Sequence, residues 1–342
     1  MKKTAMILVC LALLSGCTSQ PAEEPPVENS PAQEETPTPS PTPDPTPSPS
    51  PAEPSPSVIE MEDIGLEDIL TSLESADYSA PENYDKLVEG VTYGEITEVE
   101  YDSKTTGSTR KCLVYTPPGY NEDTTYPVLY LLHGIGGNHT EWRGGNPNEV
   151  LSNLLEAGEA PPMVAVMPNI RAAANDNTPS DVFSAESIAA FDNFINDLRD
   201  DLMPFIQENY SVSDKREDCA VAGLSMGGRE ALFIGVSMPD TFGYFAAFSP
   251  APGLLSSGEM PGQLSPEEMT LPDEYKDNTF ILICNGNQDT VVYDNPLNYH
   301  NAFDSNGIRH AYYTIDGGHY FGVWKHGLYY FAKNIFKGNT DS

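Results

Sequence analysis

The chain has 342 residues, of which 17 are Lys or Arg and 51 are Asp or Glu, and its formal net charge is -34. Binding to a phosphate backbone or adsorption to an anionic membrane surface depends on clustered Lys and Arg, so this charge argues against nucleic-acid and membrane-surface partners. A chain of this length allows one large domain or two small ones.

The first residues have the pattern of an export signal. Lys2 and Lys3 precede the apolar run "AMILVCLALL", which is too short to span a bilayer in the mature protein. The segment "LSGC", which ends at Cys17, then resembles the lipobox of bacterial lipoproteins. The resemblance implies that residues 1–17 are a lipoprotein signal peptide and that Cys17 anchors the exported protein to the outer face of a bacterial cell membrane. A plain signal peptide with an incidental cysteine is the alternative.

Residues 18–57 are a Pro/Thr/Ser-rich segment centred on "TPTPSPTPDPTPSPSPAEPSPS". Closely spaced prolines fix φ and remove backbone donors, so we expect a stiff linker without helix or sheet. Residues 58–92 are acidic, and "LEDILTSLES" has a helical pattern. We interpret them as a lead-in to a folded domain that spans residues 93–338.

From residue 93 onward the apolar pattern is that of an α/β domain. "YGEITEVEYDS" and "TRKCLVYTP" indicate an antiparallel pair of strands. Further strands are predicted at "YPVLYLLHG", "PMVAVMPN", "DCAVAGLS", "YFAAFSP", "TFILICNG" and "RHAYYTIDG". Helical patterns separate them, and Pro204 is expected to kink or end the longest, "AESIAAFDNFINDLRDDLMPFIQENY". This alternation predicts a mostly parallel central sheet with helices on both faces.

Three cysteines lie beyond the export signal, at Cys112, Cys219 and Cys284, each within a predicted strand. An odd number fits poorly with a disulfide framework. We therefore expect buried free thiols that pack as small hydrophobic side chains. One disulfide with a single remaining thiol is the alternative.

The pentapeptide "GLSMG", Gly223 to Gly227, lies between a predicted strand and a predicted helix. In that setting G-x-S-x-G is the pattern of a nucleophile elbow, at the sheet edge where chemistry collects. A side chain at either glycine would collide with the neighbouring strand or helix. Ser225 would sit at a helix N-terminus, where unpaired N–H groups favour negative charge. Ser225 is therefore the predicted nucleophile, and an ordinary turn is the alternative.

A serine nucleophile needs a histidine base. His319 lies in "DGGHYFG", a loop after the last predicted strand, and is the predicted base. The other histidines after the serine, His300, His310 and His326, fall within helices or open a strand. They are expected to be surface or packing residues.

The base in turn needs an orienting acid, which precedes the histidine along the chain in this architecture. Asp289 in "NGNQDT" follows the preceding strand and is the predicted acid. Asp294 is the reserve candidate a few residues later. Asp316 is too near His319 along the chain to reach its far nitrogen.

Acyl transfer also needs donors for its oxyanion. The N–H of Met226, directly after the nucleophile, is one, and the N–H of Ile135 in "HGIGGN" is the other. His133 is expected to brace this loop by hydrogen bonds. Trp142 and Trp324 flank the site and are predicted to bind substrate by stacking on a phenolic acyl group or a sugar face, with plain packing as the alternative for Trp324.

Several segments in combination resemble the esterase-D-like esterases: "YPVLYLLHGIGGN", Trp142, "VMPN", "ENYSV", "AVAGLSMGG", "CNGNQD" and "GGHYFGVWKHGL". The closest resemblance is to feruloyl and acetylxylan esterases of carbohydrate esterase family one, and it covers about Tyr93 to Phe336. It implies an α/β-hydrolase fold, no metal or other cofactor, and hydrolysis of esters on plant polysaccharides. It implies these roles: a triad of Ser225, Asp289 and His319, and an oxyanion hole of Ile135 and Met226.

Taken together, the residues predict a serine ester hydrolase that works through an acyl-enzyme on feruloyl or acetyl esters of a polysaccharide such as arabinoxylan. A general carboxylesterase and an acyltransferase of the mycolyltransferase type use the same machinery and remain alternatives. The lipobox alone would also fit a solute-binding lipoprotein, which has no use for a serine at an elbow with a partner histidine and acid.

Overall fold

The computed structural model describes residues 65–74, 76–256 and 262–337. The predicted signal peptide, including Cys17, and the predicted linker of residues 18–57 lie outside the described residues. All that follows concerns the folded unit to which the described residues belong.

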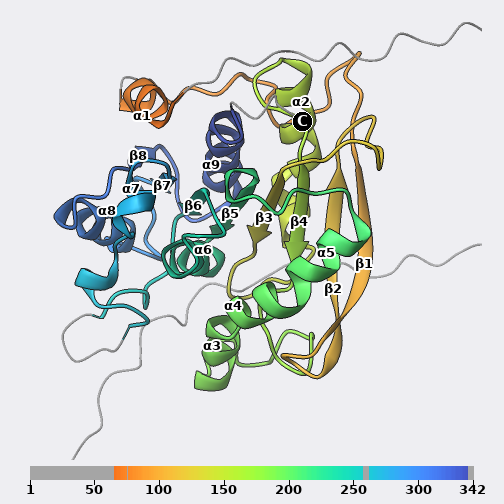
Figure 1. Ribbon diagram of the computed structural model, residues 1–342. Coiled ribbons are helices and arrows are strands. Elements are labelled where there is room, and N and C mark those ends of the chain that lie inside the picture. The colour runs from red at the N-terminus through yellow and green to blue at the C-terminus, as the bar shows by residue number, and fades with distance from the viewer. Residues whose placement is uncertain (1–64, 75, 257–261, 338–342) are drawn as a thin grey trace, which may run out of the picture. The chain divides into compact units, whose positions relative to one another are not determined.

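A sheet of eight strands in the order β1-β2-β4-β3-β5-β6-β7-β8 forms the centre of this unit (Figure 1). Strand β2 pairs antiparallel with β1 and β4, and the remaining pairings are parallel. The mostly parallel sheet is as predicted. The strands are β1 (Glu95–Ser103), β2 (Ser108–Thr116), β3 (Val128–Leu132), β4 (Val164–Pro168), β5 (Cys219–Leu224), β6 (Tyr244–Phe248), β7 (Phe280–Gly286) and β8 (Ala311–Ile315).

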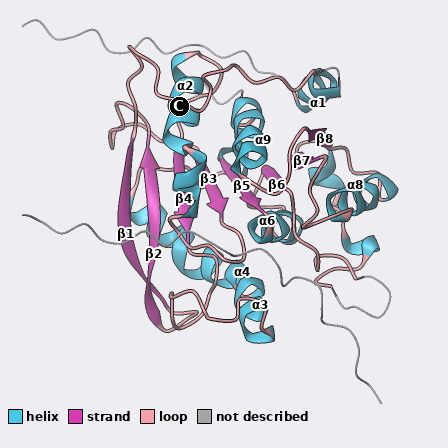
Figure 2. Cartoon of the chain, turned by 180° about the vertical axis from the view of Figure 1, so that it is seen from behind, coloured by secondary structure: helices cyan, strands magenta, loops and turns pink. Residues whose placement is uncertain are grey.

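Helices cover both faces of the sheet (Figure 2). Helices α3, α4, α5, α6 and α8 pack on one face, and α1, α2 and α9 pack on the other. Alternate residues of β3 enter the two cores, which explains its continuous apolar run. The helices are α1 (Leu66–Glu74), α2 (Pro147–Glu156), α3 (Ala185–Asp192), α4 (Phe194–Asp197), α5 (Met203–Asn209), α6 (Met226–Ser237), α7 (Asp273–Lys276), α8 (Asn295–Ser305) and α9 (Phe321–Asn334).

The long helical pattern before β5 is interrupted as Pro204 predicts. A π-helical turn over Leu198–Leu202 separates α4 from α5, and Pro204 lies in the first turn of α5. Proline has no N–H, and its ring clashes with the carbonyl four residues earlier in a regular α-helix. The wider turn ahead of Pro204 accommodates both effects.

A buried ion pair connects β2 to α4. Arg110 Nη1 lies 2.6 Å from Asp197 Oδ2, and both side chains are 0% exposed. The hydroxyl of Tyr101 donates to the same carboxylate oxygen at 2.6 Å. Arg110 Nη2 donates to the carbonyls of Asn169 and Arg171 in the loop after β4. The pair therefore fixes a loop that reaches the carboxyl edge of the sheet.

The described part of the acidic lead-in packs onto the domain. Helix α1 buries Ile69, Leu70 and Leu73 in the core shared with α9. The ring of Tyr78 stacks on Tyr313 of β8, with centroids 3.8 Å apart and planes at 12°. These residues therefore contribute to the core of the folded unit.

Cys112, Cys219 and Cys284 are buried and free, which confirms the prediction of unpaired thiols. Burial raises the pKa of each thiol to about 12. A thiol with such a pKa stays protonated at neutral pH and is a poor nucleophile, so the three cysteines act as packing residues.

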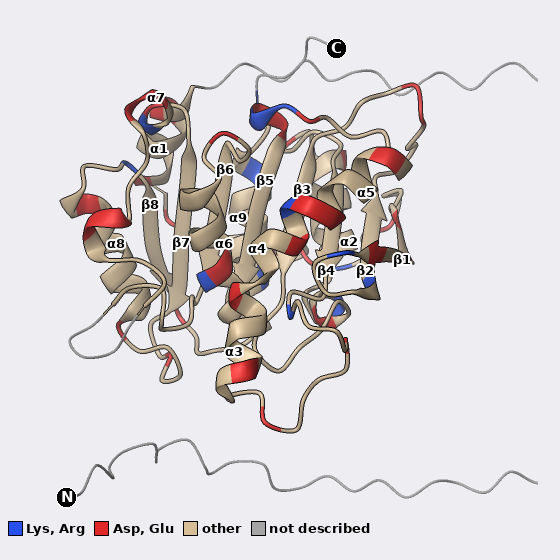
Figure 3. Ribbon diagram, turned by 60° about the horizontal axis from the view of Figure 1, so that its bottom comes forward, with Lys and Arg blue, Asp and Glu red and all other residues tan. Residues whose placement is uncertain are grey.

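The helical surface carries acidic side chains, in line with the net charge of the sequence. Figure 3 shows acidic positions on α3 and α8. In the part of the chain that the structure describes, no helix combines the length and the apolar character needed to cross a bilayer.

Candidate active site

Ser225 occupies a sharp turn between β5 and α6, with φ 52° and ψ −116°. This backbone conformation is costly for a residue with a side chain, and such strain is found at functional sites. Two hydrogen bonds hold the turn: Ser225 N donates to the carbonyl of Phe248, and Ala251 N donates to the carbonyl of Ser225, both at 2.9 Å. The end of β6 therefore maintains the strained turn.

The glycines on either side of Ser225 allow backbone segments to approach closely. A Cβ atom at Gly223 would lie 2.3 Å from the carbonyl oxygen of Gly227. A Cβ atom at Gly227 would lie 2.4 Å from the carbonyl oxygen of Leu132 in β3. Neither distance is sterically possible, so the turn can form only with glycine at both positions, as the sequence predicts.

Three side chains from three loops meet at the carboxyl edge of the sheet. His319 follows β8, and its Nε2 lies 3.0 Å from Ser225 Oγ. Asp289 follows β7, and its Oδ2 lies 2.8 Å from His319 Nδ1. The structure thus brings together the nucleophile, base and acid that the sequence predicts, in the order required for His319 to act as a general base on Ser225.

Asp289 is held as a carboxylate. Its side chain is 1% exposed, and its Oδ1 accepts hydrogen bonds from Val291 N at 3.0 Å and Val292 N at 3.2 Å. Burial raises the pKa of Asp289, but the hydrogen bond and charge of His319 together with these two N–H groups outweigh it, so the pKa is lowered overall. An ionised Asp289 can orient His319 and stabilise its protonated form.

The two other candidate acids have different surroundings. Asp294 is exposed and precedes the first residue of α8. Asp316 accepts a hydrogen bond from Gln288 Nε2 at 2.6 Å and is also exposed. The structure records no contact of either carboxylate with His319 among the described residues, which leaves Asp289 as the candidate acid.

The predicted oxyanion donors lie next to the nucleophile. The N–H of Met226 belongs to the first turn of α6 and has no acceptor within the helix. The loop after β3 approaches so closely that a Cβ atom on Gly134 would lie 3.5 Å from Ser225 Cβ. Within the described residues, nothing accepts a hydrogen bond from the N–H of Ile135 in that loop. Both N–H groups are therefore free to bind an oxyanion.

Glu141 supports this loop, although the sequence does not predict a role for it. Its Oε2 accepts a hydrogen bond from Gly134 N at 2.6 Å. Burial raises the pKa of Glu141 above its usual range, although the N–H of Gly134 and the charge of His319 act in the opposite direction. No motif distinguishes Glu141, because its partner is a backbone N–H that the fold brings to it.

His133 braces the same loop, which confirms the interpretation made from the sequence. Its Nδ1 lies 2.7 Å from the carbonyl of Gly134, and Ile170 N donates to its Nε2 at 2.9 Å. Burial lowers the pKa of His133 to about 4, so its imidazole is neutral at ordinary pH. Arg171, 2% exposed, donates to the carbonyl of Gly137 at 3.3 Å and so holds the other end of the loop.

The structure corrects the prediction that Trp142 binds substrate. Trp142 is 1% exposed, and its Nε1 donates to the carbonyl of Leu132 at 3.0 Å. Its indole packs edge-on against Phe248 and Phe321 and therefore belongs to the core. The sequence shows that Trp142 follows the oxyanion loop but not which way its side chain points.

Trp324 contacts the predicted base. Its ring meets His319 edge to face, with centroids 5.0 Å apart and planes at 84°. Trp324 is 8% exposed, so most of its surface packs against protein. This contact restricts the movement of the imidazole. A contact of Trp324 with substrate stays a prediction.

The histidines outside the triad have other partners. His326 Nε2 bonds the carbonyl of Tyr78 at 2.8 Å within the core, as expected of a packing residue. His300 and His310 contact each other beside Asp304. Among the described residues, the side chains of His300, Asp304 and His310 are the group whose spacing could hold a metal ion.

The chain is similar to known esterases. The model of the family described as "Putative esterase" matches residues 103–333. An endo-1,4-beta-xylanase/feruloyl esterase of Xylanibacter ruminicola is 31% identical over 261 residues, which are 72% of this chain and 32% of that protein. Endo-1,4-beta-xylanase Y of Acetivibrio thermocellus is 26% identical over 153 residues, which are 41% of this chain and 13% of that protein. The chain thus spans about a third or less of these two relatives.

Solved structures show the same fold. A CE1 ferulic acid esterase from Anaeromyces mucronatus, in complex with ferulic acid, matches with a TM-score of 0.72 and 33% identity, over 77% of this chain and 98% of that chain. A feruloyl esterase module from Clostridium thermocellum matches with a TM-score of 0.59 and 21% identity, over 75% of this chain and 92% of that chain. The predicted α/β-hydrolase fold is confirmed.

Proposed function

This chain belongs to the family described as "Putative esterase", and from this premise we propose that it is a serine ester hydrolase that removes feruloyl or acetyl groups from plant cell-wall polysaccharide such as arabinoxylan. The observation that carries the proposal is the continuous contact from Ser225 Oγ through His319 to Asp289. The substrate class is supported by the names of a relative at 31% identity and of a structural neighbour at 33% identity.

Acylation follows from the geometry of the site. Ser225 Oγ attacks the ester carbonyl carbon while His319 Nε2, 3.0 Å away, takes its proton. The oxyanion that forms accepts hydrogen bonds from the N–H groups of Met226 and Ile135. The intermediate collapses when His319 returns the proton to the sugar oxygen, which leaves as the alcohol, and the acyl group stays on Ser225.

Deacylation repeats these steps with water. His319 takes a proton from a water molecule that attacks the acyl carbonyl, and the same two N–H groups stabilise the second oxyanion. Collapse releases the carboxylic acid and returns the proton from His319 to Ser225. Throughout, the carboxylate of Asp289 stabilises the protonated imidazole and maintains its orientation.

The purified protein should release ferulate, acetate or both from arabinoxylan. We expect release to be lost in Ser225→Ala, because no other hydroxyl occupies the elbow. Chromatographic measurement of free ferulate and acetate, with p-nitrophenyl acetate as a generic substrate, distinguishes the outcomes. Cleavage of p-nitrophenyl acetate without release from arabinoxylan would leave an esterase but remove the cell-wall substrate. Acyl transfer to an added sugar that exceeds hydrolysis would instead favour an acyltransferase.

The proposal includes a location, supported by the N-terminal sequence alone. After cleavage directly before Cys17, a lipid on this cysteine would hold the protein at the outer face of the cell membrane, with residues 18–57 as a spacer. A spacer of this length in the polyproline II conformation, which rises about 3.1 Å per residue, would reach on the order of 100 Å. That reach would allow an anchored enzyme to act on an insoluble polymer.

Substitution of the lipobox cysteine tests this location. We expect Cys17→Ala to release the protein from the membrane fraction into the medium, because no lipid can then be attached. Fractionation with immunodetection measures the distribution, and the unmodified protein is the control. A Cys17→Ala protein that still sediments with membranes as fully as the unmodified protein contradicts the lipid anchor.

A further inference from the structure

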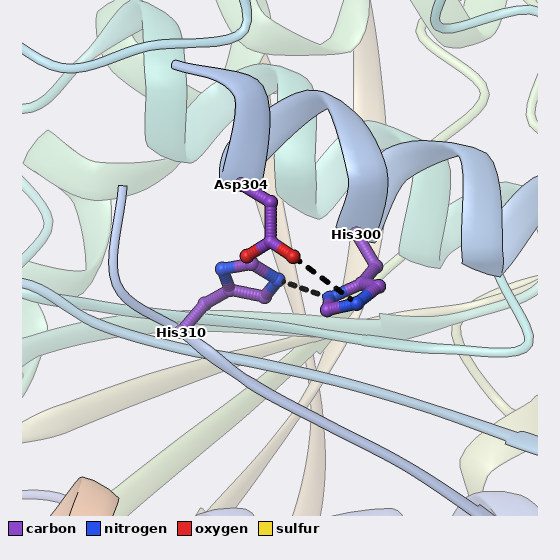
Figure 4. Close-up of side chains that lie close together, drawn as sticks. All are labelled: His300, Asp304 and His310. Carbon is purple, nitrogen blue, oxygen red and sulfur yellow. Dashed lines mark hydrogen bonds and ion pairs between the residues drawn. The ribbon is translucent and has the colours of Figure 1, made fainter. Parts of the chain in front are cut away.

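We propose that the end of α8 and the start of β8 form a binding site for one divalent transition-metal ion, held by His300, Asp304 and His310. The ligand atoms of these side chains lie within 4.8 Å of one another. Figure 4 shows the carboxylate of Asp304 and the ring of His310 directed toward His300. The site is separate from the triad and does not depend on the proposed ester hydrolysis.

The local fold explains why these residues meet. His300 and Asp304 are four residues apart on α8 and therefore share one face of the helix. Gly307, with φ +68°, reverses the chain after the helix. His310 then lies directly before β8, beside the helix that it has just left. The helix thus supplies His300 and Asp304, and the segment after the turn at Gly307 supplies His310.

The two rings are held in fixed orientations. His300 stacks on Tyr312, with centroids 4.6 Å apart and planes at 17°. His310 Nδ1 lies 2.8 Å from the carbonyl oxygen of Ile308. A carbonyl only accepts, so Nδ1 of His310 carries the hydrogen and its Nε2 presents a lone pair. A backbone carbonyl that fixes the tautomer in this way is typical of histidines that ligate metals.

The contacts of His300 call for a positive charge. Its Nδ1 lies 2.7 Å from His310 Nε2, and its Nε2 lies 3.4 Å from Asp304 Oδ2. If neutral His300 donates from Nδ1 to the lone pair of His310, its own Nε2 lone pair faces the carboxylate, and the two repel. A cation resolves this conflict, either as an added proton on His300 or as a metal ion. A metal ion bound to Nδ1 of His300 and Nε2 of His310 leaves the hydrogen of His300 on Nε2, where it faces the carboxylate of Asp304, and the carboxylate can also bind the ion.

The donor set favours Zn²⁺, with Co²⁺ as its spectroscopic substitute. Two imidazole nitrogens and one carboxylate suit these ions, whereas Mg²⁺ and Ca²⁺ prefer oxygen ligands. Tetrahedral Zn²⁺ places two nitrogens about 3.3 Å apart, so the ring nitrogens of His300 and His310, now 2.7 Å apart, need to separate by only about 0.6 Å. The side chain of Asp304 is 60% exposed and is free to adjust.

Access and local charge also favour a cation. A cavity of about 350 Å³ beside α1 is lined by Asp304 and His310 and by the carboxylate-bearing Glu67 and Glu74. Arg309 pairs with Glu67 there, and the remaining carboxylates keep the cavity acidic. Water can therefore complete the coordination of the ion, and the acidic lining raises the local concentration of cations.

Such an ion would connect the two elements that carry the triad loops. Helix α8 begins shortly after Asp289, and β8 ends shortly before His319. A metal bound at the opposite ends of these elements would cross-link helix to strand. Because the ion binds the folded state, it should raise the melting temperature in a concentration-dependent way.

The test uses the full chain after chelator treatment and dialysis, titrated with Zn²⁺ in excess Mg²⁺ by calorimetry and with Co²⁺ by visible absorption. We expect one saturable Zn²⁺ equivalent per chain, the strong visible bands of four-coordinate Co²⁺, and a higher melting temperature with Zn²⁺. His300→Gln and His310→Gln should abolish this equivalent. Asp304→Asn should weaken it by at least about 10-fold.

His139→Gln is the matched control, because His139 Nε2 and Glu98 Oε2 form a comparable surface pair at 3.0 Å that lacks a second histidine. It should bind Zn²⁺ as the unmodified chain does. Absence of a saturable equivalent, or unchanged binding in the folded His310→Gln or Asp304→Asn variants, overturns the site and leaves a proton-sharing histidine pair. If His310→Gln does not fold, the Zn²⁺ binding of Asp304→Asn decides whether the site exists, because the side chain of Asp304 is exposed and its substitution should not disturb folding. Ester hydrolysis enters none of these measurements, so each proposal can fail without the other.

Discussion

Ser225→Ala should lower ester hydrolysis by roughly 10⁶-fold, the order of magnitude found when the nucleophile of a serine triad is removed. The loss is this large because Ser225 Oγ is the atom that bonds to the acyl group, and among the described residues it is the hydroxyl that His319 contacts. The residual rate would come from the oxyanion donors and substrate binding. Initial rates on p-nitrophenyl acetate, with active sites titrated by an organofluorophosphonate, measure both activity and labelling.

Ser237→Ala is the matched control for that substitution, because Ser237 is exposed at the other end of the same helix. It should keep both hydrolysis and labelling. The double variant with Ser225→Ala and His319→Ala should hydrolyse esters only slightly more slowly than Ser225→Ala alone, because the two side chains act as a unit. Labelling of the Ser225→Ala protein at the level of the unmodified chain would assign the nucleophile to another residue.

Asp289→Asn should lower hydrolysis by about 10⁴-fold while the fold is retained. An amide has nearly the shape of the carboxylate, but its NH₂ group can face His319 Nδ1 only as a donor, which favours the wrong tautomer of the imidazole. It also removes the negative charge that stabilises protonated His319 during both transition states. The backbone N–H groups of Val291 and Val292 can still bond the amide oxygen, so the loop should stay in place.

Asp294→Asn is the control for this prediction, because Asp294 lies on the same loop but is exposed. We expect it to hydrolyse p-nitrophenyl acetate at nearly the unmodified rate. Steady-state kinetics of the two variants, with melting temperatures to verify folding, compare them directly. Near-full activity in Asp289→Asn together with a large loss in Asp294→Asn would transfer the role of the acid to Asp294.

The burial of the three cysteines and the interruption of the long helix near Pro204 could be predicted from the sequence, because each depends on neighbouring residues along the chain. Cys112 lies in an apolar strand run whatever its partners are. Pro204 disturbs the helical hydrogen bonds of its own turn. Features of this kind need no knowledge of which distant segments meet.

The sequence by itself determined the fold class and the candidate triad. Alternation of strand and helix periods depends on residues a few positions apart, and so does the glycine requirement around Ser225. Chain order then identified Asp289 and His319, because the loops after successive parallel strands all open at one edge of the sheet.

Only the tertiary structure decided which strands are neighbours in the sheet and in which direction individual side chains point. It placed β4 between β2 and β3, directed Trp142 into the core, and brought Glu141 to the N–H of Gly134. It also brought His300 and His310, which the sequence predicts only as surface or packing residues, into contact with each other. These outcomes depend on side-chain direction and on packing between distant segments, which the local periodicity of a sequence does not encode.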